Sequence, residues 1–190
     1  MWGETYSENW TVESLRELGT FGTIQDFWNL YKALPDIELL GTKNSYHLMK
    51  ITKDGYKIKP AWEDKENANG GSLNFRAVIK DAKKVWEELL LAVIGEQFTD
   101  DLAEGDEICG VTVSKRPIDF VFQLWNKKVI KTEKCPDGTY LLDKVKKIVS
   151  QIESNPQIEL KTPFYREHST KEAISSSSST TTTTTTTTTT

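Results

Sequence analysis

The stretch Pro60-Ala61-Trp62-Glu63-Asp64 separates two segments in which apolar and polar residues alternate, 45–51 and 72–79. Pro60 lacks a backbone N–H and biases the residue before it away from helix, so the stretch is predicted to be a loop. In a loop, Trp62 and Glu63 can converge on one ligand, whereas neighbours in a strand point to opposite faces. An indole face attracts a planar cation, and a carboxylate accepts hydrogen bonds from a pair of N–H groups. The pair therefore suits a cationic base with donors on its edge, and a tryptophan packed in a solvated acidic loop is the alternative.

Strand-like and helix-like patterns are interleaved along the rest of the chain. Helical spacing predicts three helices, the first capped by Thr23, the second capped by Asp81 and the third over about 140–153. The segments 108–116 and 119–125 are separated by a short turn, which indicates an antiparallel hairpin. We predict an α+β fold in which three helices cover one face of an antiparallel sheet and leave the other face for a ligand.

Three finer expectations follow from the same patterns. Alternation places Cys109 with Val111 and Val113, opposite Thr112, Ser114 and Arg116. Residues 158–160 are expected to form a final strand, and 162–172 a basic and aromatic loop. Leu91 falls outside the apolar stripe of its helix and is expected to point outward.

Composition limits the classes of protein to consider. A chain of 190 residues suits one domain, predicted over 1–172, and the Ser/Thr tract at 173–190 is predicted to be disordered. The net charge of -4 argues against indiscriminate nucleic-acid binding but permits a small basic pocket. No apolar run approaches the roughly 20 residues of a membrane span. Two cysteines, Cys109 and Cys135, favour a reduced compartment, and we expect a cytoplasmic protein.

The residues typical of catalysis do not occur in usable groupings. His47 and His168 are the only histidines, and neither has a cysteine or carboxylate at metal-ligand spacing. No glycine-rich phosphate loop and no nucleophilic triad is present. We therefore predict a binding protein rather than an enzyme, with no metal and no cofactor.

Four motifs together resemble the eukaryotic translation initiation factor 4E family, which binds the messenger RNA cap. They occur in the family's order and at near-family spacing over about residues 10–168. The motifs are 20–31 (TFGTIQDFWNLY), 59–64 (KPAWED) with Gly70-Gly71 following, 86–96 (WEELLLAVIGE), and 109–125, from Cys109-Gly110-Val111 through Arg116 to Trp125.

The resemblance implies a curved antiparallel sheet with three helices on its convex face and the 7-methylguanosine cap on its concave face. Trp10 and Trp62 would sandwich the methylated base, and Glu63 would accept hydrogen bonds from its N1 and N2 groups. The backbone N–H of Trp62 would meet its O6. Trp125 would touch the methyl group, and Arg116 would hold phosphate.

On the convex side, the resemblance implies a second site for a partner protein. Ile24, Trp28, Glu88 and Leu91 match the positions that bind the helical Tyr-x-x-x-x-Leu-Φ segment of initiation factor 4G-type scaffolds and of repressor proteins. The expected function is to recruit capped messenger RNA to the initiation machinery, as a monomer within a complex. The alternative is a cap-binding family member that represses translation or has weakened cap affinity.

The chain departs from the family pattern in three ways. It begins at about the end of the family's first strand, so that strand is largely missing. The family's basic residue after Gly-Gly is Ser72 here, and its two lysines after the phosphate arginine are Ile118 and Val121. We expect the contacts to the base to be intact, and we expect fewer basic side chains to contact the phosphates.

Overall fold

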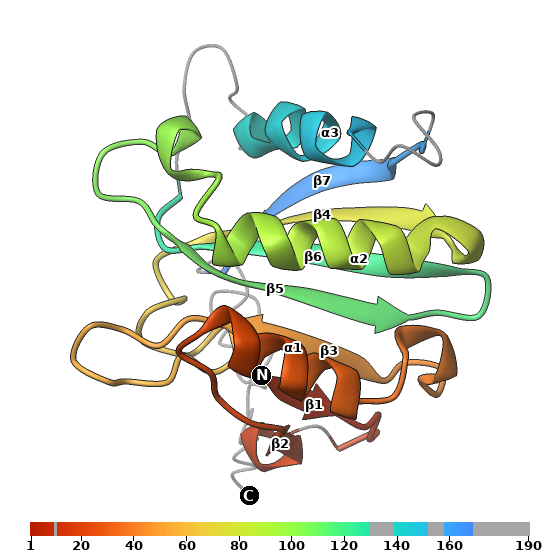
Figure 1. The fold of residues 1–190 in the computed structure, drawn as a ribbon. Coiled ribbons are helices and arrows are strands. Elements are labelled where there is room, and N and C mark those ends of the chain that lie inside the picture. Colours follow the sequence, from red (N-terminus) through yellow and green to blue (C-terminus); the bar gives the residue numbers. More distant parts are fainter. Residues whose placement is uncertain (10, 130–138, 152–157, 169–190) are drawn as a thin grey trace, which may run out of the picture.

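A single antiparallel sheet organises the chain (Figure 1). The computed structural model describes residues 1–9, 11–129, 139–151 and 158–168. Within these, seven strands lie in the order β2-β1-β3-β5-β6-β4-β7. Their bounds are β1 Trp2–Glu4, β2 Leu15–Glu17, β3 Ser45–Met49, β4 Gly71–Val78, β5 Ile108–Lys115, β6 Asp119–Asn126 and β7 Lys161–Glu167.

Three α-helices among the described residues cover the same face of the curved sheet (Figure 1). They are α1 (Ile24–Ala33), α2 (Ile79–Ile94) and α3 (Leu142–Ser150). The core lies between the helices and the sheet, where every second strand residue meets the apolar stripes of the helices. Fully buried members include Phe75, Ala77, Val85, Trp86, Leu89, Val113, Phe120, Phe122 and Val145. The predicted α+β arrangement is confirmed.

The helix ends follow local chemistry at α1 but not at α2. The side chain of Thr23 accepts a hydrogen bond from the Asp26 N–H, which confirms it as the N-cap of α1. The prediction that Asp81 caps α2 is wrong, because β4 runs directly into the helix and the N-cap is Val78. Asp81 lies in the first turn instead, where its carboxylate is favoured by the helix dipole.

Two strand predictions need correction. Residues 158–160 form no strand, and the segment expected to be a loop contains β7, which pairs with the free edge of β4. Cys109 does not face the helices with Val111, because a bulge between Ile108 and Gly110 interrupts the alternation. Its side chain packs instead with Trp125 on the opposite face.

Candidate functional site

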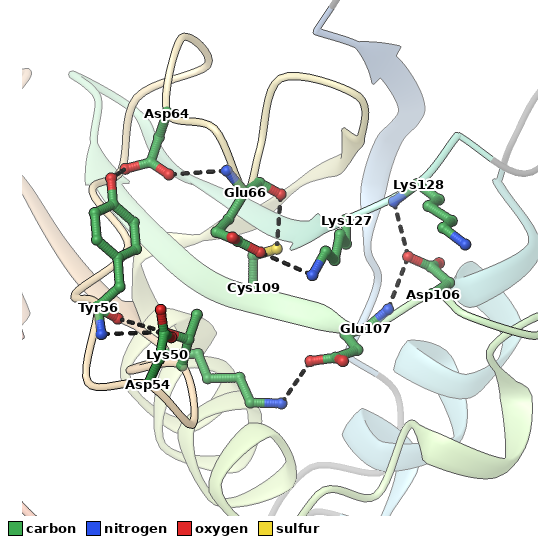
Figure 2. A network of polar contacts seen from close by, with 11 residues as sticks. Lys50, Asp54, Tyr56, Asp64, Glu66, Asp106, Glu107, Cys109, Lys127 and Lys128 are labelled. Carbon is green, nitrogen blue, oxygen red and sulfur yellow. Dashed lines mark hydrogen bonds and ion pairs between the residues drawn. The ribbon is translucent and has the colours of Figure 1, made fainter.

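The Trp62 stretch forms a loop over residues 59–70, as predicted, and Asp64 holds it in shape (Figure 2). The buried Asp64 carboxylate accepts from the Tyr56 hydroxyl at 2.7 Å and from the Lys59 and Glu66 N–H groups, each at 3.0 Å. The hydrogen bond to Asp64 raises the pKa of Tyr56 to about 12. The two neighbouring carboxylates therefore differ: Asp64 is buried and supports the loop, whereas Glu63 is exposed.

Asn67 ties the two sides of the loop together. It is fully buried, and its Nδ2 donates to the carbonyl groups of Lys59 and Ala61, each at 2.8 Å. The following Gly70 passes so close to β6 that a Cβ there would lie 1.9 Å from the Asn126 carbonyl oxygen. These constraints leave Trp62 half-buried and Glu63 exposed at the tip of a loop whose backbone is fixed.

Trp125 lies beneath this loop and is attached to it by two side chains. Trp125 is buried with Met49, Ile58 and Cys109. The Cys109 thiol donates to the Glu66 carbonyl at 3.5 Å, and burial raises the pKa of that thiol to about 12. His168 lies 2.7 Å, through Nδ1, from the Asn67 carbonyl oxygen, and its ring centroid is 5.0 Å from that of Trp125. We call the loop 59–70 together with Trp125 the base end.

Arg116 lies at the opposite end of the same strands, in the turn between β5 and β6. Trp125 pairs with Gly110, so Arg116 is six residues away along β5, about 20 Å at the rise of a strand. Its N–H donates to the Asp119 carbonyl at 2.9 Å. We call residues 116–119 the hairpin end. The structure therefore connects the loop that carries Trp62 and Glu63 to Trp125 through Cys109 and His168, and it places Arg116 at the other end of the β5–β6 hairpin.

One cation near the hairpin end, Arg76, is already paired with a carboxylate. Arg76 donates through Nη1 to the two carboxylate oxygens of Asp119, at 2.9 and 3.0 Å. Ile118 is 81% exposed, so one of the two positions where the family has lysine presents a bare apolar side chain. Ser72 lies at the base end, across from Trp125 in the sheet, and is buried.

Trp10, the other predicted stacking residue, lies outside the described residues. A cavity of about 790 Å³ opens beside the base end, next to the Lys50–Glu107 and Lys127–Glu66 ion pairs drawn in Figure 2. It shares Met49, Ile58 and Glu66 with the surroundings of Trp125, but none of the four predicted cap residues that the structure describes lines it. The predicted position of the base, between Trp10 and Trp62, is therefore distinct from this cavity.

The predicted partner residues lie on the helical face. Ile24 on α1 and Leu91 on α2 are 67% and 39% exposed, although both are aliphatic. Trp28 is half-buried, with ring contacts to Phe27 at 5.0 Å and Tyr31 at 5.8 Å. A cavity of about 340 Å³ next to Trp28 lies between α1 and the Lys83 and Glu87 turn of α2. Glu88 is half-buried on the same helix.

Sequence reasoning missed two histidines that belong to this architecture. His168 links the loop to Trp125, and the buried His47 contacts Thr112, which accepts from the Trp125 indole. A signal existed for Thr112, because alternation placed it on the concave face. No local signal marked the histidines, since their partners are far away in the sequence.

The comparison with protein families decides which family this architecture represents. The family model for eukaryotic initiation factor 4E matches residues 2–184. This chain belongs to that family. The resemblance and the curved sheet covered by three helices are thereby confirmed.

Relatives in the 4E family include eukaryotic translation initiation factor 4E-1 of Prunus domestica, 35% identical over 127 residues, which is 67% of this chain and 50% of the relative. Isoform 4E of Arabidopsis thaliana is 43% identical over 107 residues, 55% of this chain and 50% of the relative. The chain thus spans about half the length of these relatives. None of the described helices is both long and apolar enough to cross a membrane.

Solved structures of the 4E family are similar over most of the chain. The complex of C. elegans eIF4E-3 with the 4E-binding protein Mextli and cap analog matches with a TM-score of 0.69 and 27% identity, covering 90% of each chain. The complex of Ascaris suum eIF4E-3 with m2,2,7G cap matches with a TM-score of 0.67 and 26% identity, covering 88% of this chain and 86% of that one.

Proposed function

We propose that this chain binds the 7-methylguanosine cap of messenger RNA at the base end and recruits it to the translation initiation machinery in the cytoplasm. One observation carries the proposal: Asp64 and Asn67 fix a loop that carries Trp62 next to an exposed Glu63 carboxylate. Family membership supports the same ligand, since similar solved structures contain cap or cap analog.

The chemistry of the methylated base fits these groups. Methylation at N7 makes guanine cationic, so stacking on the Trp62 indole gains an electrostatic term that unmodified guanine lacks. The Glu63 carboxylate accepts from N1 and N2, and the positive charge on the base strengthens those donors. Trp10 stacks on the other side of the base, Trp125 contacts the methyl group, and Arg116 contacts phosphate.

A partner protein binds the helical face in this proposal. Its amphipathic helix carries a Tyr-x-x-x-x-Leu-Φ segment and covers the exposed Ile24 and Leu91 beside Trp28 and Glu88. Burying such aliphatic side chains is favourable by about 25 cal/mol per Å². The partner is an initiation factor 4G-type scaffold, and the chain acts as a monomer in that complex. Repressor proteins with the same segment compete for the surface.

Retention on immobilised 7-methyl-GTP tests cap binding. The wild-type chain should be retained, eluted by free 7-methyl-GTP and not eluted by GTP. Elution by both nucleotides would show a phosphate-binding site without cap specificity, and failure to bind would overturn the proposal.

Whether the cap-bound chain also binds a scaffold protein distinguishes an initiation factor from a translational repressor. Ser72, Ile118 and Val121 favour a member with weakened cap affinity, because each replaces a basic residue of the family pattern. Co-purification of the cap-bound chain with a scaffold carrying the Tyr-x-x-x-x-Leu-Φ segment supports recruitment. Retention on cap without any scaffold, together with reduced translation of capped reporters when the chain is added, supports repression.

A further inference from the structure

A row of polar contacts crosses four neighbouring strands, from the partly exposed Glu4 to the buried His47, Thr112 and Trp125. The Trp125 indole Nε1 donates to the Thr112 hydroxyl at 3.0 Å. The same hydroxyl oxygen lies 2.8 Å from Nδ1 of His47, whose Nε2 lies 3.2 Å from the Glu4 carboxylate. Glu4, His47, Thr112 and Trp125 belong to β1, β3, β5 and β6, which are consecutive in the sheet.

The indole of Trp125 fixes the direction of the first contact in this row. The indole can only donate, so the Thr112 oxygen accepts from it. In the tautomer that carries its proton on Nε2, the ring nitrogen nearest Glu4, Nδ1 of His47 accepts the Thr112 hydroxyl proton.

Burial makes this arrangement costly to disturb. Thr112 is 1% exposed, His47 3% and Trp125 6%, so a group that lost its partner here would not regain one from water. The second side of the Trp125 ring meets His168. Two contacts therefore orient the indole: its N–H donates to Thr112, and its ring packs against His168.

We propose that Thr112, His47 and Glu4 are positioning residues that set the orientation of Trp125 toward a bound ligand. None of the three contacts the ligand, and each acts through the indole N–H. The orientation of Trp125 is a property of the free protein. Its effect on cap affinity rests on the proposed function.

Three variants separate positioning from stability. Thr112→Val keeps the shape of the side chain but removes the hydroxyl, whereas Thr112→Ser keeps the hydroxyl. Ser45→Ala is the matched control, because Ser45 and Ser114 make a buried 2.8 Å hydroxyl contact between the same two strands without touching Trp125. Each variant is compared with wild type by NMR of the tryptophan indole N–H groups and of the His47 ring nitrogens, by thermal unfolding, and by titration with 7-methyl-GTP.

The wild-type spectrum should show one protonated and one unprotonated nitrogen on His47, with the proton on Nε2. Thr112→Val should shift the Trp125 indole resonance and weaken 7-methyl-GTP binding about fivefold, the effect of one lost hydrogen bond. Thr112→Ser should restore both properties. Ser45→Ala should lower the unfolding temperature as Thr112→Val does, without changing the indole resonance or the affinity.

The proposal is overturned by a His47 ring protonated on Nδ1, or by an unshifted indole resonance in Thr112→Val. Equal losses of affinity in Thr112→Val and Ser45→Ala would also overturn it, because they would show a general effect of stability. If the wild-type protein does not bind 7-methyl-GTP, the proposed function fails, and the two NMR observations still decide whether the row orients Trp125.

Discussion

The base end and the hairpin end lie at opposite ends of the β5–β6 hairpin, yet they are built differently. At the base end, Asp64 and Asn67 hold the loop through side-chain hydrogen bonds, and His168 connects Asn67 to the ring of Trp125. At the hairpin end, Arg76 is already paired with Asp119, and Ile118 points into solvent. The loop that carries Trp62 and Glu63 is therefore held in one shape, whereas at the hairpin end the neighbouring Arg76 is already paired with a carboxylate.

This difference means that affinity for a capped ligand should come from the base rather than from its phosphates. A fixed loop loses little conformational entropy when a ligand binds, so more of the stacking and hydrogen-bond energy appears as affinity. A phosphate chain gains affinity mainly from the number of cations it meets, with a salt dependence to match. Four changes test this contrast, in order of decreasing effect on cap affinity.

Removing the base-contacting side chains should have the largest effect. Trp62→Ala and Glu63→Ala should each weaken 7-methyl-GTP binding by about 2 kcal/mol or more, because a ring face or a donor edge of the base loses its partner. Quenching of tryptophan fluorescence by the cap analogue measures the affinity. Asn69→Ala, an exposed change in the same loop, is the control and should bind as wild type does. Normal affinity in both test variants would place the site elsewhere.

Loosening the loop without touching the base should have a smaller effect. Asp64→Asn keeps the size of the side chain but weakens the hydrogen bonds accepted from Tyr56, Lys59 and Glu66, so cap binding should fall by about 1 kcal/mol. Isothermal titration with 7-methyl-GTP gives this value. A loss equal to that of Glu63→Ala would mean that Asp64 contacts the ligand directly.

The titration of Tyr56 checks the cause of the Asp64 effect. Since the hydrogen bond to Asp64 raises the Tyr56 pKa to about 12, Tyr56 should ionise later than an ordinary tyrosine. Its contribution to stability is present below pH 10 and is lost as the pH rises through about 12. NMR of labelled tyrosine, assigned with Tyr56→Phe, should show a lower pKa in Asp64→Asn. An unchanged pKa would contradict the role given to Asp64.

Removing the cation at the hairpin end should cost less than either change at the base end. Arg116→Ala should lower 7-methyl-GTP affinity by less than about 1 kcal/mol and make the dependence on salt shallower. It should leave 7-methyl-GMP binding unchanged. Titrations at two salt concentrations measure both quantities. A larger loss would show that Arg116 carries the phosphate contacts, and an unchanged salt slope would point to other cations, such as the exposed Arg166 opposite Ser72.

A change on the helical face should affect neither end. Trp28→Ala should abolish binding of a Tyr-x-x-x-x-Leu-Φ peptide and leave cap affinity unaltered, because the sheet separates α1 from the concave face. Fluorescence anisotropy of a labelled peptide and cap titration of the same sample give the two results. A parallel loss of both activities, with a lowered unfolding temperature, would identify Trp28 as a core residue.

The features that sequence predicted are those set by local chemistry. Thr23 at the start of α1 is a cap that can be recognised within a few residues. The loop at Trp62 follows from Pro60 and the glycines in the same way. Leu91 was found because helical periodicity shows which residue lies off the apolar stripe.

The features that sequence did not predict depend on contacts between distant segments. β7 exists because it pairs with the edge of β4, which no pattern within its own residues indicates. Cys109 changes face because of a bulge, and a bulge breaks the alternation on which the prediction relied. His47 meets Thr112 across 65 residues, so its role beneath Trp125 required the register of the sheet.

One titration series tests most directly whether the base end carries recognition. Isothermal titration of the wild-type chain with 7-methyl-GMP, 7-methyl-GTP and GTP separates the contribution of the methylated base from that of the phosphates. The account predicts that 7-methyl-GMP binds nearly as tightly as 7-methyl-GTP and that GTP binds far more weakly than both. Equal binding of GTP and 7-methyl-GTP, with much weaker binding of 7-methyl-GMP, would show that the phosphates carry the affinity and would contradict it.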